Sequence, residues 1–273
     1  MSPRIGAYVL TGDTTWLGRS LGSYYPLLTA LVIPWPEDGL GWHGQDLPLA
    51  AIGSIVESID DRHLLRLVPG RWTDRDHPLD AETRQRQAAI DALSDEVDWI
   101  LQIDNDEVLP DPDRLLRVLT YAESRGLAAV EWPSRTLFRR TRRSVLQVAT
   151  ASGEPNYEYP GPIAVRPRTR LVSARRVDAA FLRPVVEGDD ASLQVARPAD
   201  AAEDRSSPSR PTRRSSTPVG LARRGRRGRS SPAGGMPPAC EDRSTSPWCG
   251  GPHPSPGDCC ATSTRSPARC GPG

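Results

Sequence analysis

The chain has 273 residues and contains no lysine, so its 35 basic residues are all arginine. They are balanced by 34 aspartate and glutamate residues, which leaves a formal net charge of +1. A nearly neutral chain has no overall electric field that would draw it to a polyanion. We therefore expect no nucleic-acid partner for the chain as a whole.

Long apolar runs are also missing. The most apolar stretch, residues 21–33, is interrupted by Gly22 and Pro26 and is shorter than the roughly 20 residues that cross a bilayer. Residues 5–10, the first apolar run, are too few for the apolar region of a secretory signal. We expect no transmembrane segment and a cytoplasmic location.

The C-terminal part has few large apolar side chains. Residues 201–273 contain only Val219, Leu221, Met236 and Trp248 of that kind, together with 12 of the 28 prolines. Such a composition buries too little apolar surface to offset its chain entropy. We predict a globular domain over residues 1–187, followed by a low-complexity Arg/Pro/Ser/Gly-rich tail over residues 188–273 that is disordered.

Three origins of this tail are open. Its composition is typical of an out-of-frame translation of a GC-rich gene, which is the interpretation we favour. Residues 223–229 (RRGRRGR) instead suit a tail that binds RNA or another anionic surface. All five cysteines lie in the tail, but Cys259 and Cys260 are adjacent and no paired CxxC knuckle occurs, which argues against a zinc module.

The first 190 residues alternate short apolar runs with helical patterns. This alternation predicts an α/β fold, a Rossmann-type mainly parallel sheet flanked by helices. Ligands of such sheets lie beyond the carboxyl ends of the strands, so the residues after Thr11, Ile33, Val68 and Ile103 should share one edge. The expected strands are 5–11, 30–33, 63–68, 99–103 and 128–131, and the expected helices are 17–28, 49–59, 78–94 and 115–124.

Three carboxylates crowd into residues 104–107, whose sequence is Asp-Asn-Asp-Glu. Like charges this close repel one another unless water or a cation neutralises them. Mg²⁺ or Mn²⁺ takes one or two carboxylates and completes its shell with water and phosphate oxygens. Because Asp and Asn also suit turns, and Pro110 follows, a plain acidic turn is the alternative.

The surrounding sequence resembles the family-2-type glycosyltransferases. The resemblance is carried by residues 84–109 (RQRQAAIDALSDEVDWILQIDNDEVL), in which an arginine-bearing helix leads into a DxD motif, and by residues 8–25 and 159–166. The usual Arg-Asn pair of that helix is Arg86-Gln87 here. The resemblance implies a GT-A fold and a hexosyltransferase-like enzyme (EC 2.4) that transfers a sugar from a UDP- or GDP-sugar to an unknown acceptor.

The resemblance also implies which residues bind the donor. Asp106, together with Asp104, would ligate the Mn²⁺ or Mg²⁺ that bridges the diphosphate, and both would contact the nucleotide sugar. Four further residues would bind the nucleotide part. Thr11 and Gly12 lie at the end of the first expected strand, Asp38 follows the second expected strand, and Arg86 lies on the helix before the DxD motif.

The acceptor side is less defined. Aromatic faces suit the apolar faces of sugars, so Trp132 and Tyr159 are candidate acceptor-binding residues, and Arg166 would suit an anionic acceptor. An inverting enzyme also needs a general base near the acceptor hydroxyl. The sequence does not identify it, and the weak candidates are Glu131, Glu158 and Asp178.

Two other functions are compatible with the sequence. If the tail is out of frame, the chain is a non-catalytic, truncated or frameshifted glycosyltransferase remnant. The acidic cluster could also serve a metal-dependent phosphoryl-transfer enzyme, although two-metal sites need further carboxylates on separate strands.

Overall fold

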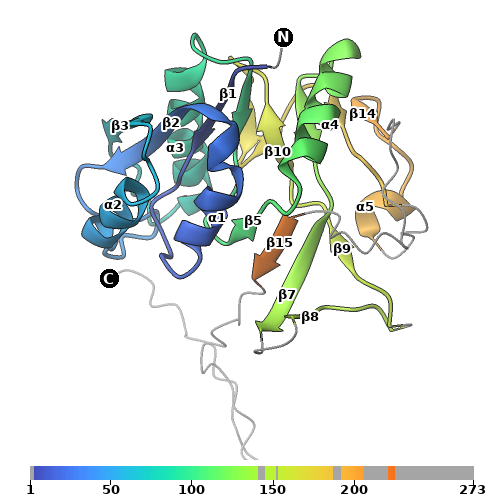
Figure 1. Ribbon diagram of the computed structural model, residues 1–273, viewed down its shortest axis with the longest axis horizontal. Helices are drawn as coiled ribbons and strands as arrows, with labels where there is room; N and C mark the ends of the chain where they lie inside the picture. Colours follow the sequence, from blue (N-terminus) through green and yellow to red (C-terminus); the bar gives the residue numbers. More distant parts are fainter. Residues whose placement is uncertain (1–2, 141–144, 152, 187–191, 206–220, 225–273) are drawn as a thin grey trace, which may run out of the picture. The chain divides into compact units, whose positions relative to one another are not determined.

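A sheet of eight strands forms the centre of the computed structural model, which describes residues 3–140, 145–151, 153–186, 192–205 and 221–224 (Figure 1). The strands are β1 (Ile5–Tyr8), β2 (Leu28–Pro36), β3 (Leu65–Gly70), β4 (Trp99–Leu101), β6 (Ala129–Glu131), β10 (Pro162–Val165), β13 (Phe181–Leu182) and β14 (Glu203–Asp204). Their order across the sheet is β14-β13-β6-β10-β4-β1-β2-β3.

All neighbouring strands of this sheet run parallel except at β10, which is antiparallel to both β4 and β6. The predicted mainly parallel sheet is therefore confirmed. Strand β10 was not among the expected strands, and it separates β4 from β6, which are successive among those expected.

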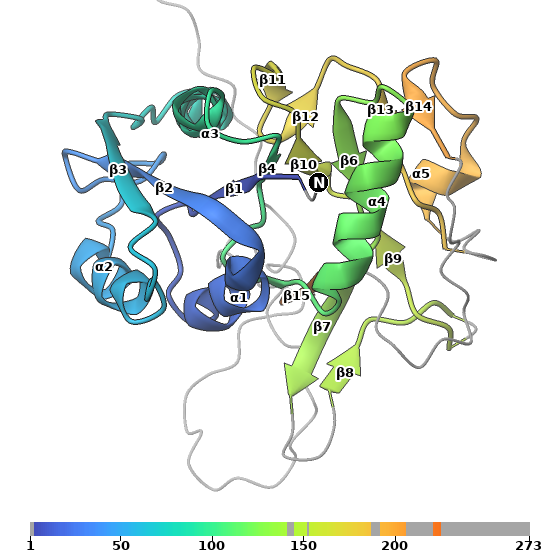
Figure 2. The same cartoon turned by 45° about the horizontal axis from the view of Figure 1, so that its top comes forward.

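Helices cover both faces of the sheet (Figure 2). Buried leucines and valines of α1 (Leu17–Tyr24), α2 (Leu49–Glu57) and α4 (Pro112–Ser124) join one apolar cluster, and α3 (Pro78–Leu93) contributes to the other. Residues of β1 alternate between the clusters, with Ala7 in the first and Tyr8 in the second. This is the period-two pattern of a strand that is buried on both faces.

The inward face of α3 is not purely apolar. Ala89, Ile90 and Leu93 pack on the sheet, but Gln85 and Arg86 on the preceding turn are buried as well. Buried polar side chains need partners. Gln85 donates to the carbonyl of Pro34 (3.0 Å) and accepts from the Trp42 indole (2.7 Å). Helix α3 therefore places a charged side chain, that of Arg86, against the sheet.

A second sheet adjoins the carboxyl end of β4. It contains β5 (Glu107–Val108), β15 (Leu221–Arg224), β7 (Ser134–Arg140) and β8 (Val145–Gln147), and β9 (Tyr157–Glu158) pairs with β7. Strand β15 runs parallel to β7 and antiparallel to β5, so its backbone joins two segments of the globular part. A separate hairpin is formed by β11 (Leu171–Ser173) and β12 (Arg176–Val177).

Part of the predicted tail lies in the structure. Residues 192–205 form the short helix α5 (Leu193–Ala196) and the sheet strand β14, and residues 221–224 form β15. Glu203 on β14 pairs with Arg183, a contact that a count of apolar residues overlooks. The rest of the tail, with its cysteines, lies outside the described residues. No helix in the described part is long and apolar enough to cross a membrane.

Candidate functional site

The carboxyl ends of β1 and β4 lie side by side, because the two strands pair in parallel with Ala7 opposite Leu101. Residues 104–107, which we call the acidic loop, are separated from the end of β4 by Gln102 and Ile103. The Asn105 side-chain amide donates to the carbonyls of Leu10 (2.7 Å) and Asp13 (3.5 Å). The acidic loop and the loop after β1 are thus tied together at the edge where the sequence predicts a ligand.

Asp104 is held from three directions. Its backbone carbonyl accepts from the Ser20 hydroxyl on α1 (3.0 Å), and its backbone N–H donates to Oε2 of Glu107 (3.0 Å). Its carboxylate lies 2.8 Å from Nη2 of Arg86 and 3.8 Å from Nη1 of Arg175. These contacts fix both the backbone and the side chain of the first motif aspartate.

Arg86 is buried, with 3% of its surface exposed, and its guanidinium is shared among several acceptors. It donates to Oε1 of Glu82 (2.7 and 2.9 Å), to Asp104, and to the Tyr8 hydroxyl (3.3 Å). Burial alone would lower the pKa of Arg86, but Asp104, Tyr8 and Glu82 raise it well above its usual value. Arg86 is therefore a permanent cation beneath the acidic loop.

Glu107 is fully buried and paired with a guanidinium that the sequence analysis did not identify. Arg175 lies in the turn of the β11–β12 hairpin, and its Nη1 and Nη2 lie 2.8 and 2.7 Å from the two oxygens of Glu107. Two parallel bonds of this kind are the strongest arrangement for an arginine and a carboxylate. Glu107 therefore links the buried Arg175 to the backbone of the acidic loop, because it also accepts from the Asp104 N–H.

Asp106 lies at the turn of the acidic loop and is partly exposed. In this part of the protein Arg86 pairs with Glu82 and Asp104, and Arg175 pairs with Asp104 and Glu107. No group of three or more His, Cys, Asp or Glu side chains suited to a metal occurs in the described residues. A Mg²⁺ or Mn²⁺ ion held by Asp104 and Asp106 would therefore have to take its remaining ligands from phosphate and water.

The predicted nucleotide-binding residues lie along this edge. Thr11 follows β1 and is buried, and its Oγ1 has no hydrogen-bond partner among the described residues. Gly12 is next to open space, since an added Cβ would meet nothing within 4 Å. Asp38 follows β2, which is parallel to β1, and its carboxylate accepts from the Leu40 N–H (3.1 Å) in an exposed loop. The structure thus groups Thr11 and Gly12 with the acidic loop, and places Asp38 farther along the same edge.

The predicted acceptor residues do not share one place. Trp132 and Tyr159 are each 3% exposed, and the Trp132 indole N–H has no partner among the described residues. Arg166 follows β10, which runs antiparallel to β4, so it lies at the start of β4 and not at its carboxyl end. There it pairs with Glu123 (3.0 Å) and covers the Trp99 ring (5.2 Å).

The candidate general bases differ in environment. Glu131 is buried and paired with Arg183. Burial raises the pKa of Glu131, and the Arg183 guanidinium opposes that rise. Glu158 on β9 and Asp178 after β12 are both exposed. The pairing of Glu131 is that of a structural ion pair, whereas Glu158 and Asp178 have the exposure that a reacting group needs.

Comparison with known proteins finds similarity to solved structures but not to sequences. No protein-family model and no curated protein matches the sequence. A 4-diphosphocytidyl-2C-methyl-D-erythritol synthase from Anaerococcus prevotii is 14% identical with a TM-score of 0.37, over 62% of this chain and 73% of that one. A second synthase of the same name is 13% identical with a TM-score of 0.33, over 61% of this chain and 74% of that one.

A mannosyltransferase from Pyrobaculum calidifontis, solved with GDP-Man and Mn²⁺, is also similar. It is 19% identical with a TM-score of 0.32, over 48% of this chain and 36% of that one. TM-scores below 0.5 carry no argument about function. The function is therefore argued from the residues of the acidic loop and its surroundings.

Proposed function

We propose that the chain is a glycosyltransferase-type enzyme that binds a UDP- or GDP-sugar at the carboxyl ends of β1 and β4. The observation that supports this most is the acidic loop itself. It presents two partly exposed aspartates, Asp104 and Asp106, on a backbone fixed by Asn105, Ser20 and Glu107. A fixed loop that presents two carboxylates at this edge suits a divalent cation and the diphosphate that the cation would bridge.

Asp106 and Asp104 are the residues that would hold Mn²⁺ or Mg²⁺. The metal would neutralise the negative charge of the leaving nucleoside diphosphate. Arg86 and Arg175 set the charge balance of the loop, and their donors are largely taken by carboxylates. We therefore assign Arg86 to holding Asp104, and not to contacting a phosphate directly.

The loop after β1 would bind the nucleotide. The buried hydroxyl of Thr11 can donate to or accept from a ligand, and the open space at Gly12 leaves room for one. Asp38 would contact the base or ribose from the end of β2. All these residues lie within residues 1–187, which we propose as the nucleotide-sugar-binding part.

For the transfer, the bond between the sugar and the diphosphate breaks and a bond to an acceptor oxygen forms. The acceptor hydroxyl loses its proton to a base. We propose Glu158 or Asp178 for that role ahead of Glu131, because Glu131 already neutralises Arg183. The buried Trp132 and Tyr159 would pack beneath the acceptor-binding surface. Arg166 lies at the opposite edge of the sheet, at the start of β4.

Calorimetry tests this proposal. UDP- and GDP-sugars are titrated into the purified protein with and without Mn²⁺, and the titration is repeated with Asp106→Ala and with Asp61→Ala, an exposed aspartate after α2. We expect Mn²⁺-dependent binding that Asp106→Ala weakens at least tenfold and Asp61→Ala leaves unchanged. Absence of binding to folded protein would overturn the proposal and favour the non-catalytic remnant.

A further inference from the structure

The β11–β12 hairpin inserts Arg175 into the interior beside the acidic loop. Its turn is tight, with Ala174 in the left-handed region at a φ of 47°. Arg175 is 3% exposed and donates not only to Glu107 but also to the carbonyls of Gln102 (3.2 Å) and Pro160 (3.5 Å). A long polar side chain from a surface hairpin thus finds all its acceptors in the interior.

The neighbouring backbone is shaped around this side chain. Gly161 has a φ of 120°, and a Cβ added there would lie 3.1 Å from Cγ of Arg175. Any other residue at this position would be strained and would crowd the stem of Arg175. The path of the arginine is therefore set by the main chain before β10 as well as by its acceptors.

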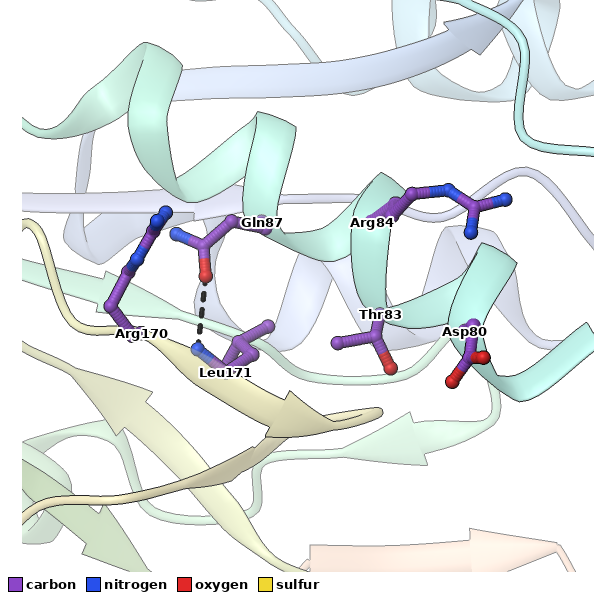
Figure 3. A pocket seen from close by; sticks show the side chains of 6 residues that line it. All are labelled: Asp80, Thr83, Arg84, Gln87, Arg170 and Leu171. Carbon is purple, nitrogen blue, oxygen red and sulfur yellow. Dashed lines mark hydrogen bonds between the residues drawn. The ribbon is translucent and has the colours of Figure 1, made fainter.

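Helix α3 anchors the hairpin by side-chain to backbone hydrogen bonds, and Figure 3 shows the one between Gln87 and Leu171. Oε1 of Gln87 accepts from the N–H of Leu171 (2.9 Å), and its Nε2 donates to the carbonyl of Thr169 (3.2 Å). The Thr83 hydroxyl accepts from the N–H of Ala174 (2.8 Å). A hollow of about 360 Å³ remains beside these contacts, lined by Asp80, Thr83, Arg84, Gln87, Arg170 and Leu171.

The same helix therefore controls both cations of the acidic loop. Arg86 projects from α3 to Asp104, and Thr83 and Gln87 hold the hairpin that carries Arg175 to Glu107. Glu107 in turn accepts from the backbone N–H of Asp104 (3.0 Å). A continuous chain of contacts runs from α3 through Arg175 and Glu107 to the backbone of the motif.

We propose that Arg175 is a positioning residue, which holds the acidic loop in the shape that binds a metal–nucleotide complex. The contacts of Arg175 and Glu107 are enough to infer that Arg175 fixes the loop. The effect on ligand affinity rests in addition on the proposed function. Partners that orient first-contact ligands typically change metal affinity by about 10–100-fold when they are removed. We expect an effect of that size at Arg175.

The first experiment measures the loop itself, by amide hydrogen exchange over residues 104–109. The variants are Arg175→Met, Arg175→Met combined with Glu107→Gln, and Arg176→Met, the exposed neighbour on the hairpin. The double variant removes both buried charges, so it keeps the fold if the single variant does not. We expect at least tenfold faster exchange in the loop of the folded Arg175 variants, and an unchanged exchange rate in Arg176→Met. Unchanged exchange would overturn the proposal.

The second experiment titrates Mn²⁺ with UDP and with GDP into the same proteins and Arg175→Lys. We expect at least tenfold weaker Mn²⁺-dependent binding in the double variant, partial recovery in Arg175→Lys, and no change in Arg176→Met. If the wild-type protein binds neither nucleotide, the proposed function fails, while the exchange result still decides the loop. If it binds and the double variant binds equally well, Arg175 does not position the site.

Discussion

The described residues contain two clusters built around buried arginines and carboxylates, which differ in how far their carboxylates are exposed. In and beside the acidic loop, Arg86 and Arg175 pair with Glu82, Asp104 and Glu107. At the β14 end of the strand order, in the Arg183 cluster, three arginines pair with Glu131, Asp200 and Glu203. These arginines are Arg183, Arg197 and Arg205.

The difference shows that burial of an ion pair does not by itself indicate function. In the Arg183 cluster every carboxylate has an arginine partner, and the cluster fixes β6, β13 and β14 to one another. In the acidic loop Glu107 is buried in the same way, but Asp104 and Asp106 are partly exposed, whereas Glu131 and Glu203 of the Arg183 cluster are both buried. The exposure of the two aspartates therefore distinguishes the candidate site from the structural ion pairs.

The largest effect is expected for Arg183→Met, which separates the two clusters most clearly. It leaves Glu131 buried and without its cation, so the free energy of unfolding should fall by about 3–5 kcal/mol. Urea denaturation followed by circular dichroism measures the loss. Nucleotide-sugar affinity of the protein that remains folded should be unchanged. A parallel loss of affinity would show that the two clusters are not independent.

A second effect is expected in alkali, at Tyr8 beneath the acidic loop. Burial raises the pKa of Tyr8 to about 12, with Arg86 opposing the rise. The unfolded chain releases this proton near pH 10 and the folded protein retains it, so the stability that Tyr8 contributes is lost as pH rises from 10 to 12. The loss is about 2–3 kcal/mol.

Tyr8→Phe tests this alkaline loss. Denaturation curves between pH 9 and 12 should show a shallower decline in the variant than in the wild type. Some decline should remain, because burial also raises the pKa of Tyr24. Equal slopes in both proteins would mean that Tyr8 does not contribute.

A smaller change in stability is expected for Asn105→Ala, which cuts the tie between the acidic loop and the loop after β1. The carbonyl of Leu10 loses its donor, so the free energy of unfolding should fall by about 1–2 kcal/mol. Calorimetry should also show severalfold weaker binding of the nucleotide sugar. A variant that loses stability but keeps full affinity would make this tie structural only, like the pairs of the Arg183 cluster.

The smallest effect is expected for an exposed ion pair. Asp95 and Arg168 lie 2.8 Å apart, with side chains 82% and 79% exposed. Asp95→Ala should change the free energy of unfolding by less than about 0.5 kcal/mol, because solvent screens the pair. Urea denaturation gives the reference against which the buried clusters are judged, and a loss above 1 kcal/mol would undermine that reference.

Local patterns predicted much of the fold because each element has its own periodicity. Helices α2 and α3 begin where they were expected, and the apolar runs of β1, β2 and β4 are strands. Strand β10 was missed because it has only four residues and its neighbours in the sheet are distant in sequence.

Strand β14 was also missed. It pairs with β13, and its Glu203 pairs with Arg183, a contact that composition does not reveal.

The acidic loop could be located from sequence, but its partners could not. Asp104 and Asp106 follow a recognisable strand, and Asn105 lies between them. Arg175 lies 68 residues from Glu107, among many other arginines, and no local pattern separates it from an exposed one. Pairing over such separations is set by the tertiary fold, so it appears only in the structure.

The late position of β10 in the chain has a consequence for synthesis on the ribosome. Strands β1 to β4 can pair in the order in which they emerge, but the place between β4 and β6 stays empty until Pro162–Val165 has been made. From Glu131 to Pro162 the ribosome adds about 30 residues, which takes roughly 2–6 s at usual elongation rates. During that interval the nascent chain exposes an unpaired β4 edge, which is open to pairing with a neighbouring nascent chain.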